Sequence, residues 1–165
     1  MADSLIRERD EAVAPYVQYV IYEIQMLTQL PPWIEKFDVE GPAVLKNACL
    51  ESYLLHARTI IEFLMGRPGK SGRRRRHRDD VRVKMFCDWA APDESAFDSV
   101  LREIDRHLSH LSKHRADATG EGGIEWAISL GDALLVHLDA LAQRMLRAGS
   151  VHAHAIDAAC HPVTG

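Results

Sequence analysis

The stretch from Pro42 to Gly66 leaves this chain little choice of secondary structure. It reads P-A-V-L-K-N-A-C-L-E-S-Y-L-L-H-A-R-T-I-I-E-F-L-M-G, and its apolar residues recur at the spacing of one helix face. Proline is favoured in the first turn of a helix and glycine just past its end, so the sequence marks both boundaries. We therefore expect a helix between these two residues.

The same signals predict three further helices. We expect them at Pro15–Leu30, at Asp93–Arg115, where Asp93 is the N-cap, and at Ile124–Arg147, which Gly149 closes. The chain has no internal repeat and no series of alternating apolar and polar segments bounded by turns. The predicted fold class is therefore all-α, a four-helix bundle that forms a single domain over residues 1–148.

Positive charge is concentrated in the loop between the second and third expected helices. The formal net charge of the chain is −4, yet residues 66–78 hold seven of its twenty lysines and arginines. A segment rich in glycine and like charges buries too little apolar surface to be ordered, so we expect a mobile loop. Its guanidinium groups favour a phosphate backbone, and RNA is the expected partner, although an acidic protein would suit the same charges. The expected nucleic-acid-binding residues are Arg73, Arg74, Arg75, Arg76, Arg58 and Arg115.

The cysteine count and the N-terminal sequence indicate the cellular compartment of the chain. Its three cysteines are odd in number and lack the C-x-x-C spacing of metal sites, which favours a reducing compartment. The first residues are acidic where a signal peptide would be basic, and no apolar stretch reaches membrane-spanning length. We expect a cytoplasmic protein with no membrane partner.

The last residues, 149–165, are expected to form a flexible tail. Their side chains include four potential ligands that could chelate adventitious metal, namely His152, His154, Cys160 and His161. Because exposed chain termini are usually poorly ordered, we expect this tail to have no function.

Histidines follow one side of the third expected helix. Glu103, His107, His110 and His114 recur there at helical spacing, next to the face that carries Phe97, Leu101, Ile104 and Leu108. An imidazole at the margin of a buried face can titrate near neutral pH, ligate a metal or transfer a proton. The alternative is the ordinary polar margin of an amphipathic helix.

Two polar features lie on opposite sides of the second expected helix. Asn47, Glu51, Arg58 and Glu62 share one side, which we interpret as a solvated face with an Arg58–Glu62 pair at i,i+4. His56 lies on the apolar side, where a core histidine can hydrogen-bond a backbone carbonyl.

A metal site is one alternative for these histidines. Antiparallel packing could bring His56, the third-helix strip and His137, which lies on the apolar side of the last helix, into one core. His110 and His114 have the i,i+4 spacing for one ion, and Glu103 or Glu51 could add an oxygen. This spacing resembles the DinB-like metal-binding bundles, which implies a site built from His56, His110, His114 and His137. A further alternative is a non-enzymatic helical interaction module whose histidines are structural.

A more extended resemblance runs from Asn47 to Leu141. The segments N-A-C-L-E-S-Y-L-L-H-A-R-T-I-I-E-F-L and I-D-R-H-L-S-H-L-S-K-H-R, with a later tryptophan, resemble bacterial helical proteins related in appearance to HEPN domains. The signature of HEPN ribonucleases is an arginine followed, after four to six residues, by a histidine. Arg102 and His107 fit this spacing, with four residues between them. Arg106 and His110 miss it by one residue. Glu103 follows the arginine, where asparagine, histidine or aspartate is typical of that family.

The resemblance implies a homodimer that cleaves RNA without a metal or other cofactor. In that case Arg102 would stabilise negative charge on the phosphate, and His107 would act as acid or base on the ribose 2′-hydroxyl with His110 as its partner. Arg102, His107 and His110 are therefore the expected catalytic residues.

Overall fold

The computed structural model describes residues 2–65, 81–89, 94–109 and 121–162. These residues form helices and their connections with no strand among them, which confirms the all-α prediction. Four helices overlap the expected ranges, namely α1 (Ala2–Gln29), α3 (Ala43–Met65), α5 (Glu94–Ser109) and α7 (Glu121–Arg147). The structure adds α2 (Pro31–Glu40), α4 (Val83–Phe86) and α8 (Ala153–Cys160) to this set.

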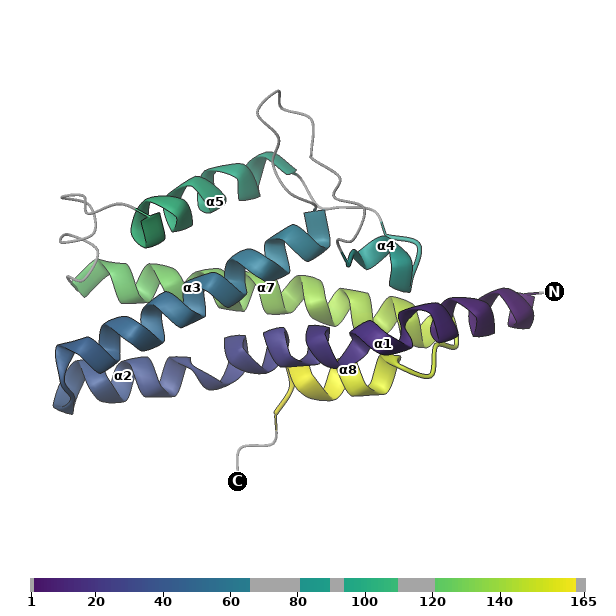
Figure 1. Cartoon of the computed structure of the whole chain (residues 1–165), viewed down its shortest axis with the longest axis horizontal. Helices are drawn as coiled ribbons and strands as arrows, with labels where there is room; N and C mark the ends of the chain where they lie inside the picture. Colours follow the sequence, from purple (N-terminus) through teal and green to yellow (C-terminus); the bar gives the residue numbers. More distant parts are fainter. Residues whose placement is uncertain (1, 66–80, 90–93, 110–120, 163–165) are drawn as a thin grey trace.

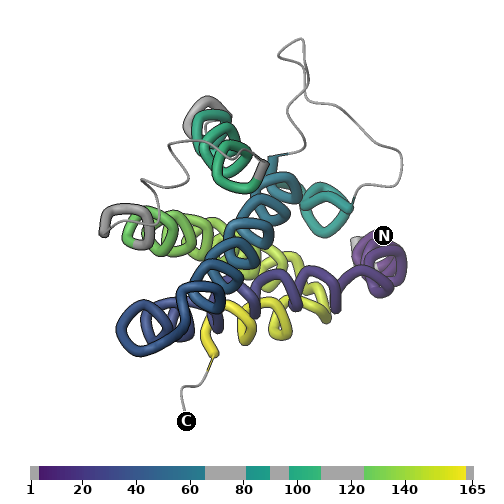
Figure 2. The backbone as a smooth tube through the Cα atoms, turned by 60° about the vertical axis from the view of Figure 1, so that its left-hand side comes forward, coloured from purple at the N-terminus to yellow at the C-terminus, as the bar shows by residue number. Residues whose placement is uncertain are grey.

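Helix α3 lies at the centre of the arrangement (Figure 1). It contacts α1 and α2 on one side and α5 and α7 on the other, while the short α4 packs against α1 and α3. Helix α8 lies against both α7 and α1, as the view in Figure 2 also shows. The side chains that fill the space between these helices are almost completely buried, among them Ile24, Tyr53, Ile61, Ile104, Leu134, Leu138 and Leu141.

Helix α1 begins at Ala2 and continues through Pro15, whereas the sequence predicts a start near Pro15. A proline inside a helix forfeits one backbone hydrogen bond, which disfavours the helix. Here Pro15 is exposed, and Val13 and Val17 are buried on either side of it. The buried apolar face continues past the proline. The free energy gained from this burial outweighs the loss of one backbone hydrogen bond.

The prolines that end α1 also begin α2. The N–H of Leu30 donates to the carbonyl of Met26 at 3.2 Å, and the N–H of Ile34 donates to the carbonyl of Leu30 at 3.0 Å. Pro31 and Pro32 occupy the first positions of α2, where an N–H has no helical partner. A pair of prolines is therefore both a stop and a start signal.

Residues after α7 form a turn and a packed helix in place of the expected flexible tail. Gly149 has φ 76° and closes α7 as predicted, with the N–H of Ser150 donating to the carbonyl of Met145 at 3.0 Å. The following helix α8 buries four side chains, Ala153, Ile156, Ala159 and Cys160. Apolar residues at helical spacing thus dock even this short segment against α1 and α7.

Candidate functional site

Helix α5 presents one side to the core and another to solvent. Phe97, Leu101 and Ile104 are buried, whereas Arg102 and Arg106 are exposed. This division follows from the apolar spacing of the segment, because residues three and four apart share one side of a helix. The predicted amphipathic character of the helix is therefore confirmed.

His107 lies at the edge of this buried side, next to α7. Its ring centroid is 5.5 Å from that of Trp126, and the two rings are tilted by 36°. Its Nε2 is 3.7 Å from Oε1 of Glu103, while Oε2 of Glu103 accepts a hydrogen bond from Arg106 at 3.1 Å. Only 13% of the His107 side chain is exposed. Glu103 therefore lies between a guanidinium and the imidazole that the sequence singled out.

Arg102 lies on a different side of α5 from His107. A separation of five residues turns a helix by roughly 140°, so the two side chains of one copy diverge. His110, the third expected catalytic residue, lies outside the described residues, and so do His114 and Arg115.

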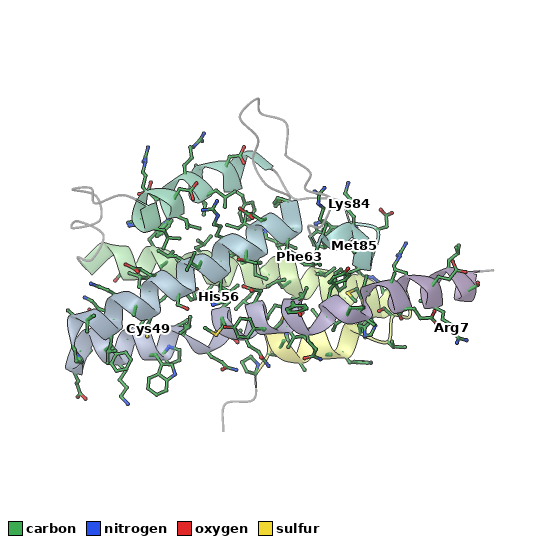
Figure 3. The ribbon with its side chains drawn as sticks, in the orientation of Figure 1. Arg7, Cys49, His56, Phe63, Lys84 and Met85 are labelled. Atoms are coloured by element: carbon green, nitrogen blue, oxygen red, sulfur yellow. The ribbon has the colours of Figure 1, made fainter. Side chains whose placement is uncertain are left out.

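His56 is held by a carboxylate on a neighbouring helix. Its Nδ1 is 2.6 Å from Oε2 of Glu23 on α1, and its ring forms a T-shaped contact with the ring of Tyr22 at a centroid distance of 5.4 Å. Figure 3 places it where α3 faces α1. A satisfied, half-buried histidine agrees with the structural interpretation, although its partner is a side chain and not the backbone carbonyl that we expected.

His137 of α7 lies against Phe97 of α5, with 5.5 Å between the ring centroids. Burial lowers the pKa of this histidine because desolvation penalises the charged imidazolium. Its apolar surroundings agree with its position on the apolar side of the expected helix.

Three of the described histidines therefore have separate partners in place of the shared core site that the metal hypothesis requires. His56 faces α1, His107 faces Trp126, and His137 faces Phe97. Within the described residues, none of these three histidines belongs to a group of three potential metal ligands. The pairing of His110 with His114 lies outside the described part of the chain.

Arg58 joins α3 to α5. Its Nε donates to Glu62 at 3.1 Å, which is the predicted i,i+4 pair, and its Nη1 donates to Asp105 on α5. Two of the five N–H donors of this guanidinium therefore engage carboxylates, so Arg58 links two helices and its side of α3 is not simply a solvated face. The expected contacts Arg73, Arg74, Arg75 and Arg76 lie outside the described residues.

Sequence reasoning missed a polar junction between the N-terminal half of α1 and the turn before α8. The buried carboxylate of Asp10 accepts a hydrogen bond from Ser150 Oγ at 2.7 Å and from the N–H of Val151 at 2.9 Å. Beside it lies an open groove of about 740 Å³, whose lining includes Arg7, Arg147 and His152. Arg7, near the start of α1, is labelled in Figure 3. Nothing local signals this junction, since its partners are 140 residues apart.

None of the described helices combines the length and the apolar character needed to cross a bilayer. Comparison with protein-family models, with curated proteins and with solved structures gives no match to this chain.

Proposed function

We propose that this chain is an HEPN-like, RNA-associated protein that binds single-stranded RNA along the exposed side of α5 and the neighbouring edge of α7. We call Arg102, Arg106, His107 and Trp126 the α5 surface. The observation that carries the proposal is that α5 carries both His107, whose ring contacts Trp126 of α7, and two exposed guanidinium groups, those of Arg102 and Arg106. Single-stranded nucleic acids are bound by this combination of aromatic rings for bases and cations for phosphates.

The two arginines differ in how freely they can reach a phosphate. Arg106 shares Glu103 with His107, and 56% of its side chain is exposed. Arg102 is exposed and forms no ion pair with another described residue. Arg102 is therefore the stronger candidate for a direct phosphate contact. In this proposal Arg73, Arg74, Arg75, Arg76 and Arg115, which lie outside the described residues, add positive charge for binding the RNA backbone.

The proposal includes cleavage of the bound RNA without a metal. His107 takes the proton of a ribose 2′-hydroxyl, and the 2′-oxygen attacks the adjacent phosphorus. The bond from phosphorus to the 5′-oxygen breaks, and that oxygen leaves with a proton supplied by His110. The products are a 2′,3′-cyclic phosphate and a 5′-hydroxyl. Arg102 stabilises the additional negative charge on the phosphate oxygens.

Cleavage requires two copies of the chain in this proposal. Because Arg102 and His107 of one copy diverge around α5, the reacting phosphate lies between Arg102 of one protomer and His107 of its partner. This agrees with the homodimer that the HEPN resemblance implies.

The reducing cytoplasm is the proposed compartment, where Cys49, Cys87 and Cys160 remain the free thiols that the structure contains.

Binding is tested by fluorescence anisotropy with a labelled single-stranded RNA over a series of salt concentrations. For a single strand, each lost phosphate contact lowers the slope of log K against log salt by about 0.7. The double variant R102A/R106A should therefore lower the slope by about 1.4 and weaken binding. Arg9→Ala, which removes an exposed arginine from α1, is the matched control. An unchanged slope in the double variant would contradict the proposed surface.

Cleavage is tested separately, by gel analysis of the same RNA in the presence of a chelator. General acid–base catalysis contributes about 10²–10⁴-fold, so His107→Gln should lower the cleavage rate by at least about a hundredfold, as should Arg102→Ala. His154→Gln, which alters an exposed histidine of α8, should keep the wild-type rate. If the wild-type chain binds the RNA but does not cut it, the proposed ribonuclease activity is rejected and the proposed RNA binding is retained. Cleavage that persists in His107→Gln would reject His107.

A further inference from the structure

Two carboxylates and an imidazole meet where the end of the chain packs against α7. They belong to Asp139 of α7, to Asp157 of α8 and to His161, the residue that follows α8. One ligand atom from each residue lies within 4.8 Å of those of the other two. His161 Nε2 and Asp139 Oδ1 are already 3.3 Å apart.

The fold holds these three residues in place. Asp157 and His161 are four residues apart, and the N–H of His161 donates to the carbonyl of Asp157 at 3.2 Å, so both side chains lie on one side of the last turn. Ile156 and Ala159 are buried and dock this turn against its neighbours. The arrangement therefore depends on packed helices and not on a free chain end.

Negative charge at this point is poorly neutralised. Within the described residues, no lysine or arginine forms an ion pair with Asp139 or Asp157, and the ion-pair partner of Asp139 is His161. The pair of carboxylates thus creates a field that favours a cation.

We propose that Asp139, Asp157 and His161 bind a divalent transition-metal ion of the zinc class, with water completing its coordination shell. Zinc accepts carboxylate oxygens and imidazole nitrogens at about 2.0–2.2 Å, which places neighbouring ligand atoms of one shell about 3.4 Å apart. Small side-chain rotations bring the three atoms to this spacing. An imidazole ligand favours zinc and its neighbours in the transition series over magnesium or calcium, which prefer oxygen alone.

The ion would connect α8 to α7. Because its ligands come from two helices and from the residue after the second, they converge only when α8 is docked. Binding is therefore coupled to the folded arrangement, and the metal should raise the melting temperature of the chain.

Isothermal titration calorimetry tests the site on the tag-free, full-length protein after chelator treatment, with zinc chloride as the probe and magnesium chloride as the comparison. We expect one equivalent of zinc and no heat from magnesium. Asp157→Asn and His161→Gln should each weaken zinc binding by more than about tenfold, since even residues that only support a ligand have effects of that size. His154→Gln, on the exposed side of the same helix, should bind like the wild type.

Two further measurements complete the test. Circular-dichroism melts without metal establish that the variants are folded, and zinc should raise the melting temperature of the wild type but not that of His161→Gln. Zinc affinity that is equal in His161→Gln and the wild type would overturn the proposal. Titration with cobalt gives the donor set, because an intense thiolate-to-cobalt absorption band would identify cysteine as the ligand and overturn the assignment to carboxylates and imidazole.

Discussion

Gly131 of α7 illustrates how closely two helices can approach at a single residue. A Cβ atom at this position would lie 1.7 Å from the hydroxyl oxygen and 2.8 Å from Cζ of Tyr53, whose side chain is buried on α3. The Tyr53 hydroxyl lies 3.5 Å from the carbonyl oxygen of Ile128, to which it donates. The absent side chain of Gly131 therefore makes room for the tyrosine ring.

We expect Gly131→Ala to destabilise the chain. Overpacking a core costs about 1–3 kcal/mol, and the better helix propensity of alanine returns at most about 1 kcal/mol. The net loss in the free energy of unfolding should therefore be about 1–2 kcal/mol, measured by urea denaturation. Introducing Tyr53→Phe in the same chain removes the closest clashing atom and should make the alanine substitution less costly. A stabilised Gly131→Ala variant would contradict the observed approach.

Partners within one helix were predictable from the sequence, whereas partners on other helices were not. Arg58 and Glu62 are paired because residues four apart on a helix face each other, whatever the helix packs against. The second partner of Arg58 is Asp105, and the partner of His56 is Glu23. These contacts depend on which helices are neighbours, and no local pattern encodes that.

At the scale of the elements, His137 couples the packing of α5 and α7 to pH. Its pKa is lowered from 6.5 by burial, so below that pH the unfolded chain binds the proton more readily than the folded chain. The contribution of neutral His137 to stability is complete above about pH 6.5 and is lost as the pH falls through its lowered folded-state pKa. Acidification should therefore loosen the contact with Phe97.

We expect His137→Leu to reduce the dependence of stability on pH. The leucine does not titrate, so the free energy of unfolding of this variant should fall less between pH 7 and pH 5 than that of the wild type. Chemical denaturation at a series of pH values measures the difference. His154→Ala, at an exposed position of α8, should keep the wild-type pH dependence. Parallel curves for the wild type and His137→Leu would contradict the role assigned to burial.

A helix boundary was predicted correctly where the local sequence signal alone determines it, and incorrectly where tertiary packing overrides that signal. Gly149 ends α7 because the left-handed backbone at φ 76° favours glycine, and the sequence indicates this directly. Pro15 gave a misleading start for α1, because tertiary burial of Val13 and Val17 carries the helix through it. A proline sets a local preference, and packing determines whether that preference decides the structure.

At the scale of the whole molecule, the sequence identified the fold class but not the way its helices combine. Apolar periodicity predicted α3, α5 and α7 because each buries one side. The expected convergence of His56 and His137 in one core depended on helix order and rotation. In the structure α3 lies between two groups of neighbours, so His56 faces α1 while His137 faces α5.

Helix α8 provides a test of the whole arrangement, because its contacts join the end of the chain to α1 and α7. Ile156 is fully buried at 0% exposure, and replacing such a residue by alanine costs about 2–5 kcal/mol through lost burial and the cavity left behind. Urea denaturation of Ile156→Ala should show this loss, while His154→Ala on the exposed side of α8 should change stability by less than about 0.5 kcal/mol. If both variants were as stable as the wild type, α8 would be a detached tail. A large loss in Ile156→Ala alone would establish that the last helix is part of the core.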